Sequence, residues 1–113
     1  MTYLSSNARN YMNAVAADLL GDWPTGKPYV PAGEERATGL LMHCESRQQE
    51  LAVHMAHFGY EVSPHTPGWI RVTGRPTNYE AVRDMEIRRA QQRVDWLRET
   101  ATDADLHHFT NAL

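Results

Sequence analysis

The chain has 113 residues, enough for one domain whose core needs no disulfide or metal to hold it together. Its hydrophobic share of 42% and charged share of 22% are those of an ordinary soluble globular protein. Its formal charge of −3 argues against a strongly basic surface of the kind that binds nucleic acid. Cys44 is the only cysteine, which excludes an intrachain disulfide and a multi-cysteine zinc site. We therefore expect a single domain over residues 1–113.

The first ten residues, MTYLSSNARN, contain no basic segment followed by an apolar one, so we expect no secretory signal. No apolar run approaches the roughly 18 residues that a membrane span needs. These features predict a cytoplasmic protein that binds no membrane. Ten arginines stand against one lysine, Lys27, and this skew favours GC-rich coding and hence an actinobacterial or phage origin.

The N-terminal segment has the periodicity of an amphipathic helix. Apolar residues recur there at three- and four-residue spacing: Ala8, Met12, Val15 and Leu19. Ser5 or Ser6 can cap the start, and Gly21 can end the helix. We therefore predict a helix over residues 6–20.

Residues 21–33 contain three prolines and three glycines. Because proline fixes φ and removes a hydrogen-bond donor, neither a helix nor a central strand is expected there. We interpret the segment as a long loop in which Trp23 and Tyr29 are anchors against the body of the protein or contacts for a partner.

The next segment, residues 34–58, again shows a helical stripe. Its apolar members are Leu40, Cys44, Leu51, Met55 and Phe58. Ser46 and Gln49 have capping-box spacing, so two helices with a break near Ser46 stay an alternative. One helix is favoured, because the stripe keeps its phase across the break.

Two short strands follow, over about residues 60–63 and 69–73, with PHTPG as the turn between them. In the second strand Trp69, Arg71 and Thr73 share the face opposite Ile70 and Val72. Since a lone hairpin is marginal in water, its apolar face must lie on helices or on another copy's sheet.

The segment over residues 78–100 is predicted to be a long helix, capped by Thr77 or Asn78. It has two apolar sides. One is a seam of Ile87, Ala90, Val94, Leu97 and Ala101, and the other contains Val82, Met85 and Trp96. A short helix is expected over residues 103–111. The fold class is therefore α+β, mostly helical, in the order α-α-β-β-α with one antiparallel hairpin packed on helices.

Histidines offer a candidate metal site. On a helix, Glu50, His54 and His57 lie about one turn apart, and a carboxylate with two imidazoles can bind zinc or iron. The spacing differs from the H-E-x-x-H motif of zinc proteases. A polar helix flank with solvated histidines is the favoured explanation, so no metal site is favoured, and a pH-sensing role of the histidines stays an alternative.

Catalytic motifs are absent from the sequence. It contains no G-x-S-x-G elbow, phosphate-binding glycine-rich loop or dinucleotide fingerprint. Cys44 falls in an apolar stripe, where a thiol is typically a small buried hydrophobe. We therefore expect no enzyme activity, no cofactor and no small-molecule substrate.

The order helix, hairpin, long helix is also the order found in some winged-helix DNA-binding regulators. In that arrangement Arg47, Gln48 and Gln49 would contact bases or phosphates, and Arg71 and Arg75 would lie on the wing. The helix that would read the groove, however, has a single arginine, which Glu50 offsets.

The sequence fits best with a small non-catalytic module for protein interaction or regulation. An adaptor, or an accessory or structural protein of a phage or mobile element, would have these features. The two apolar sides of the long helix predict self-association, with DNA as the alternative partner. The predicted contact residues are Trp23, Tyr29, Trp69, Val82, Met85 and Trp96.

Overall fold

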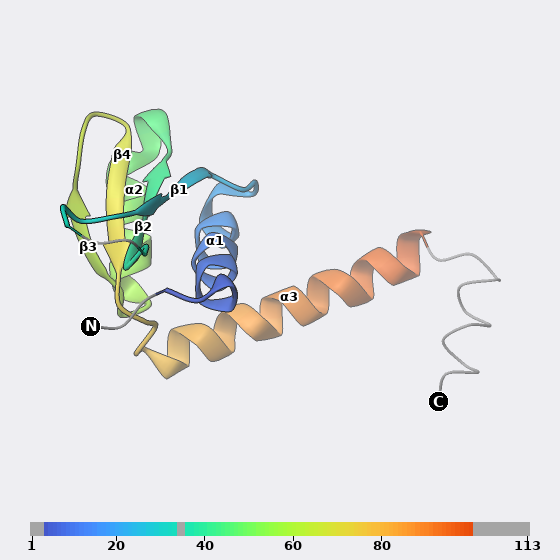
Figure 1. Cartoon of the computed structure of the whole chain (residues 1–113). Coiled ribbons are helices and arrows are strands. Elements are labelled where there is room, and N and C mark those ends of the chain that lie inside the picture. The colour runs from blue at the N-terminus through green and yellow to red at the C-terminus, as the bar shows by residue number, and fades with distance from the viewer. Residues whose placement is uncertain (1–3, 34–35, 101–113) are drawn as a thin grey trace. The chain divides into compact units, whose positions relative to one another are not determined.

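The computed structural model describes residues 4–33 and 36–100, and it divides the chain into two compact units, residues 1–82 and 83–113. Three helices and a four-stranded antiparallel sheet confirm the α+β class (Figure 1). The elements are α1 (Ser6–Leu20), β1 (Thr25–Tyr29), β2 (Gly39–His43), the short 3₁₀ helix η1 (Glu45–Arg47), α2 (Gln48–His57), β3 (Glu61–Pro64), β4 (Trp69–Thr73) and α3 (Tyr79–Thr100).

Helix α1 has the predicted boundaries and the predicted caps. The Ser5 hydroxyl oxygen accepts a hydrogen bond from the Ala8 N–H at 3.1 Å. Gly21 ends the helix in the left-handed conformation, with φ of 74°, and donates its N–H to the Ala17 carbonyl. A positive φ is disfavoured for residues with a Cβ, so glycine suits this C-cap.

The sequence had indicated a long loop over residues 21–33. This prediction is wrong in part, because Thr25–Tyr29 forms strand β1. This strand pairs only with β2, so it lies at an edge of the sheet. The missing N–H of Pro28 is tolerated at an edge, where one side of the strand needs no partner.

The prediction of one helix over residues 34–58 is wrong for its first part. Gly39–His43 forms strand β2, η1 follows, and α2 begins only at Gln48. A break near Ser46, the alternative to one helix, does exist, but what precedes it is a strand. The short helix expected over residues 103–111 lies outside the described residues.

The hairpin of β3 and β4 is confirmed, and it belongs to a larger sheet with strand order β1-β2-β4-β3. In the central pair, Leu40 lies opposite Val72 and Met42 opposite Ile70. These four side chains point to one face and are buried, whereas Trp69 and Arg71 lie on the other face, as predicted.

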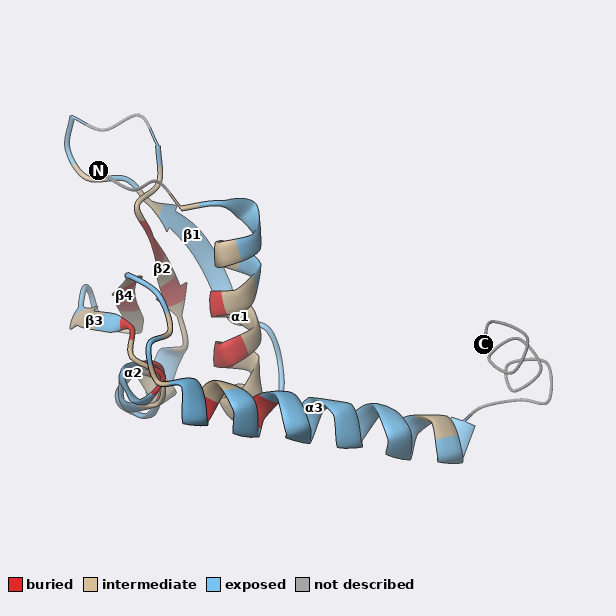
Figure 2. Ribbon diagram, turned by 90° about the horizontal axis from the view of Figure 1, so that it is seen from below, coloured by how far each residue is buried: buried red, intermediate tan, exposed pale blue. Residues whose placement is uncertain are grey.

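Both α1 and α2 cover the buried face of the sheet. Helix α2 packs against β3 and β4, and α1 packs against α2. Near β1 the approach of α1 is close: a Cβ on Gly26 would lie 3.3 Å from Asn13 Oδ1. Figure 2 shows the resulting core, with buried residues on α1, β2 and β4. Its largest fully buried side chains in unit 1 are Phe58, Met12, Met42, Leu51, Met55, Ile70, Val15 and Val72.

The connection from β4 to α3 is fixed against the end of α2. Gly59 has φ of 99°, and a Cβ there would lie 2.6 Å from the Thr77 nitrogen, so only glycine fits. Asn78, one of the two predicted caps, accepts from the Ala81 N–H through Oδ1 and donates from Nδ2 to the His57 carbonyl at 2.8 Å.

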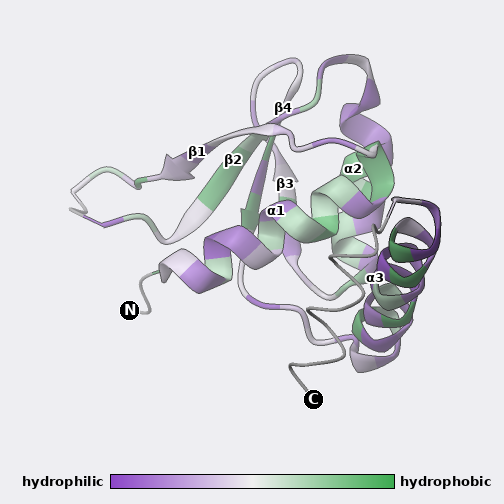
Figure 3. Ribbon diagram, turned by 90° about the vertical axis from the view of Figure 1, so that its right-hand side faces the viewer, coloured by the Kyte–Doolittle hydropathy of each residue, from purple (hydrophilic) through white to green (hydrophobic). Residues whose placement is uncertain are grey.

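Beyond its first turns, α3 is mostly exposed. Met85 is fully buried, but Ile87 and Trp96 are 60% and 54% exposed. Hydrophobic and hydrophilic residues alternate around this helix in Figure 3. Among the described residues, no helix has both the length and the apolar character needed to cross a membrane.

Candidate functional site

The face of the sheet opposite α1 and α2 is the most distinctive surface of unit 1, and we call it the open face. Apart from the buried Gly39, its side chains are exposed or half-buried. The strand register places Lys27, Leu41 and Arg71 side by side across three strands, and Thr25, His43 and Trp69 in the next row. The central side chains of the open face are Lys27, Tyr29, Leu41, His43, Trp69 and Arg71.

Aromatic rings and cations interleave on the open face. The Arg71 guanidinium carbon lies 4.4 Å from the centre of the Tyr29 ring, and Lys27 Nζ lies 5.5 Å from the centre of the Trp69 ring. His43 lies beside Trp69, with ring centres 4.9 Å apart and planes tilted by 40°. Both cation–π contacts cross β2 diagonally, so the rings are held in fixed positions above the sheet.

The charge of the open face differs from that of the whole chain. Two of its three rows contain Lys27 and Arg71 and no carboxylate, whereas the chain as a whole has a formal charge of −3. Glu61, the first residue of β3, is in the third row, with Tyr29, where its carboxylate accepts a hydrogen bond from the Thr73 hydroxyl. The centre of the open face is therefore a small positive area on an acidic protein.

Arg71 also has a hydrogen-bond donor that the described residues do not use. Its Nε is buried and has no acceptor among them. Guanidinium groups commonly bind two oxygens of a phosphate through paired N–H donors, although the buried Nε of Arg71 is itself not open to such a ligand.

Three of the residues singled out from the sequence meet on the open face: Tyr29, Trp69 and Arg71. Lys27, Leu41 and His43 were not predicted to be contact residues, because they lie in segments that were not predicted to be strands. The alternation in the second strand of the hairpin was the signal that placed Trp69 and Arg71 on one face, and Tyr29 was singled out as an aromatic of the Pro- and Gly-rich segment.

The other predicted contact residues lie elsewhere. Trp23 is 58% exposed in the connection between α1 and β1. Val82, Met85 and Trp96 belong to α3, where Val82 is half-buried and Met85 is fully buried. The side chain of Met85 is therefore not available as a surface contact.

The residues of the winged-helix alternative do not form one surface. Arg47 pairs with Glu50 at 3.0 Å. Gln48 fixes the hairpin turn, donating to the Trp69 carbonyl at 2.8 Å and accepting from the Gly68 N–H at 2.9 Å. Strand β4, moreover, is paired on both sides, so the hairpin is an integral part of the sheet and not a free wing.

The candidate metal ligands line one groove beside α1, together with Leu19, Gln49 and Val53. Within it, His54 Nε2 lies 2.9 Å from the Val15 carbonyl oxygen and 3.6 Å from the Asp18 carboxylate. Glu50 is the ion-pair partner of Arg47. No group of three or more His, Cys, Asp or Glu in residues 4–33 and 36–100 is placed to hold a metal ion.

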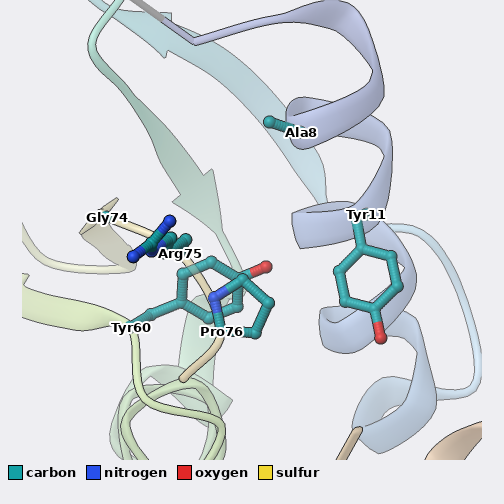
Figure 4. Close-up of a pocket in the computed structure, with 6 residues that line it drawn as sticks. All are labelled: Ala8, Tyr11, Tyr60, Gly74, Arg75 and Pro76. Carbon is teal, nitrogen blue, oxygen red and sulfur yellow. The ribbon is translucent and has the colours of Figure 1, made fainter. Parts of the chain in front are cut away.

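A small pocket lies between α1 and the end of β4, with a volume of about 210 Å³. Figure 4 shows the ring of Tyr11 on one side and Tyr60 and Pro76 on the other. Its lining consists of Ala8, Tyr11, Tyr60, Gly74, Arg75 and Pro76. Burial raises the pKa of Tyr60, and nearby Tyr11 adds to that shift. Tyr60 is thus a neutral phenol in a mainly apolar pocket.

Cys44 precedes η1 and is half-buried, with its Sγ 3.9 Å from the Gly68 carbonyl oxygen. Burial raises the pKa of this thiol, and Arg47 opposes the shift only in part. Since the thiolate is the reactive form of cysteine, this environment does not activate Cys44 as a nucleophile.

The open face thus has the geometry of a binding surface: fixed rings, two cations and an apolar centre at Leu41. Comparison of the chain with models of protein families, with curated proteins and with solved structures finds no match.

Proposed function

We propose that this protein is a non-catalytic binding module whose open face binds single-stranded nucleic acid. The observation that supports the proposal is the interleaving of Tyr29, His43 and Trp69 with Lys27 and Arg71 on one accessible sheet face. Aromatic rings stack on unpaired bases, and the cations between them neutralise backbone phosphates.

A single strand fits this face better than a duplex does. The open face is an array of side chains on a sheet, with no helix or free wing to enter a groove. Stacking on Trp69 or on the Arg71 guanidinium requires bases that are not already stacked in a double helix. The ring contacts therefore favour unpaired bases.

Stacking is expected to contribute more than charge, because only two cations lie in the centre of the open face. Two neutralised phosphates give a slope of about −1.4 for the logarithm of affinity against the logarithm of salt concentration on a single strand. Each stacked base contributes about 1–3 kcal/mol. A modest salt dependence together with a strong dependence on the rings is the signature of this mode.

The test is fluorescence anisotropy of labelled oligothymidine and oligouridine at low and moderate salt. We expect Trp69→Ala to weaken binding by about tenfold or more, the loss of one stacked base. Lys27→Ala should reduce the magnitude of the salt slope by about 0.7, the contribution of one phosphate contact. Circular dichroism of each variant verifies that it remains folded.

Two matched controls accompany these variants. Trp23→Ala removes an exposed tryptophan outside the sheet, and Arg83→Ala removes an exposed cation of α3. Neither should change affinity by more than about twofold. The proposal is wrong if wild-type protein fails to bind either oligonucleotide at low salt. It is equally wrong if polyglutamate displaces the strand as well as unlabelled oligonucleotide does, since the face would then recognise acidic chains.

A further inference from the structure

The second half of α3 presents an apolar seam at the surface. Ile87 is 60% exposed and Val94 41% exposed, Ala90 is exposed, and Leu97 is half-buried. Ala101 of the predicted seam lies outside the described residues, so the seam consists of Ile87, Ala90, Val94 and Leu97. Its spacing of three, four and three residues is that of a helix that packs lengthwise against another helix.

Polar and charged side chains surround the seam, so it is a narrow stripe on a hydrophilic helix. The second half of α3 is too short to be more than marginally stable as a helix in water unless it buries an apolar face. We propose that the seam packs against the same seam of a second copy of this chain, with the two helices antiparallel. This inference is independent of the proposal for the open face, because it depends on α3 alone.

The antiparallel register follows from matching all four seam residues. When two such helices run in opposite directions, each a-type position meets a d-type position of the other. Ile87 then lies opposite the partner's Leu97, and Ala90 opposite the partner's Val94. By symmetry this arrangement gives four layers, each pairing one residue from each helix. The larger side chains meet at the ends and the small Ala90 meets Val94 in the middle.

The charges that flank the seam distinguish the two orientations. In the antiparallel register Asp84 lies beside the partner's Arg98, and this attraction occurs twice. Arg93 meets the partner's Arg93 once. In a parallel pair Arg93 would lie beside the partner's Arg98 on both sides, without a compensating carboxylate. Like charges at these flanking positions oppose pairing, so the charge pattern selects the antiparallel arrangement.

The first experiment is sedimentation of the full chain from low micromolar to near-millimolar concentration. We expect a monomer–dimer equilibrium. Val94→Glu places a charge in two central layers, so it should weaken dimerisation at least about tenfold. Gln92→Glu adds the same charge two residues away, on the side of α3 opposite the seam, and should leave the equilibrium unchanged. A strict monomer over the whole range, or equal effects of the two variants, would overturn the proposal.

Charge reversal then tests the orientation. Arg98→Glu should weaken an antiparallel dimer about threefold to tenfold, because two attractions become repulsions. The double variant Asp84→Arg with Arg98→Glu should restore the affinity. In a parallel dimer Arg98→Glu would instead strengthen association, since it would pair with the partner's Arg93. Stronger association of Arg98→Glu would therefore refute the antiparallel arrangement.

Discussion

At the scale of single residues, Tyr60 shows how burial sets the chemistry of a side chain. The ring is 5% exposed and lies beside Tyr11 in the pocket of Figure 4. Burial and the neighbouring phenol both raise its pKa above the ordinary tyrosine value of about 10. The neutral phenol is compatible with the pocket, and the phenolate would be poorly solvated there.

This shift predicts how stability responds to alkali. Below a pH of about 10, Tyr60 is neutral in both the folded and the unfolded chain, so it adds no pH dependence. As pH rises through that value, the unfolded chain loses the proton and the folded chain keeps it, so the free energy of unfolding falls. Tyr60→Phe should flatten this decline in urea unfolding measured between about pH 8 and pH 11.

The control for that measurement is Tyr79→Phe, which removes a phenol that is 79% exposed. It should leave the alkaline decline as in the wild type. An equally steep decline in Tyr60→Phe and wild type would show that burial of Tyr60 has no influence on alkaline stability.

At the scale of elements, local sequence was sufficient for α1, the hairpin and α3, because each contains its own signal. Ser5 and Gly21 mark the ends of α1. Residues 69–73 alternate between the open face of the sheet and its buried face. Three members of the open face were also singled out from the sequence: Trp69 from the hairpin and Tyr29 from the Pro- and Gly-rich segment as contact residues, and Arg71 from the winged-helix alternative as a candidate for nucleic-acid contact.

Strands β1 and β2 were not predictable in the same way. In β2, Leu41 is apolar although it lies on the open face, so no polar–apolar alternation is visible, and Leu40 and Cys44 mimic a helical stripe. In β1, Gly26 and Pro28 oppose strand formation. Both strands are stabilised by pairing with another segment of the chain, as Leu40 is with Val72. Local sequence patterns do not indicate such pairing. Lys27 and His43 were missed for that reason.

The start of α3 gives a prediction at this scale. Asn78 caps the helix through Oδ1 and joins it to the end of α2 through Nδ2. Asn78→Ala removes both hydrogen bonds and should lower the free energy of unfolding by about 1–2 kcal/mol in urea denaturation. Asn78→Asp keeps the capping oxygen and loses only the bond to the His57 carbonyl, so it should lower stability by less. If the two variants are equally unstable, the cap contributes nothing.

At the scale of the whole molecule, charge and apolar surface are divided between two places. The centre of the open face is positive, although the chain is acidic overall, and the seam of α3 is apolar within a hydrophilic helix. A dimer formed through the seam would contain two open faces, one from each chain. Binding of nucleic acid and self-association would then reinforce each other, although they use different residues.

This arrangement predicts a dependence on strand length. Once one open face holds a strand that can reach both, the second face binds at a high effective concentration, so a long oligothymidine should bind at least about tenfold tighter than a short one. Val94→Glu should keep the affinity for the short strand and lose most of that gain, and Trp69→Ala should weaken binding of both strands.

A long strand also contains more overlapping sites, and this statistical gain in affinity persists in a monomer. The difference in this gain between the wild type and Val94→Glu therefore measures the part of the affinity gain that comes from dimerisation. Equal gains in the two proteins would mean that each copy binds alone.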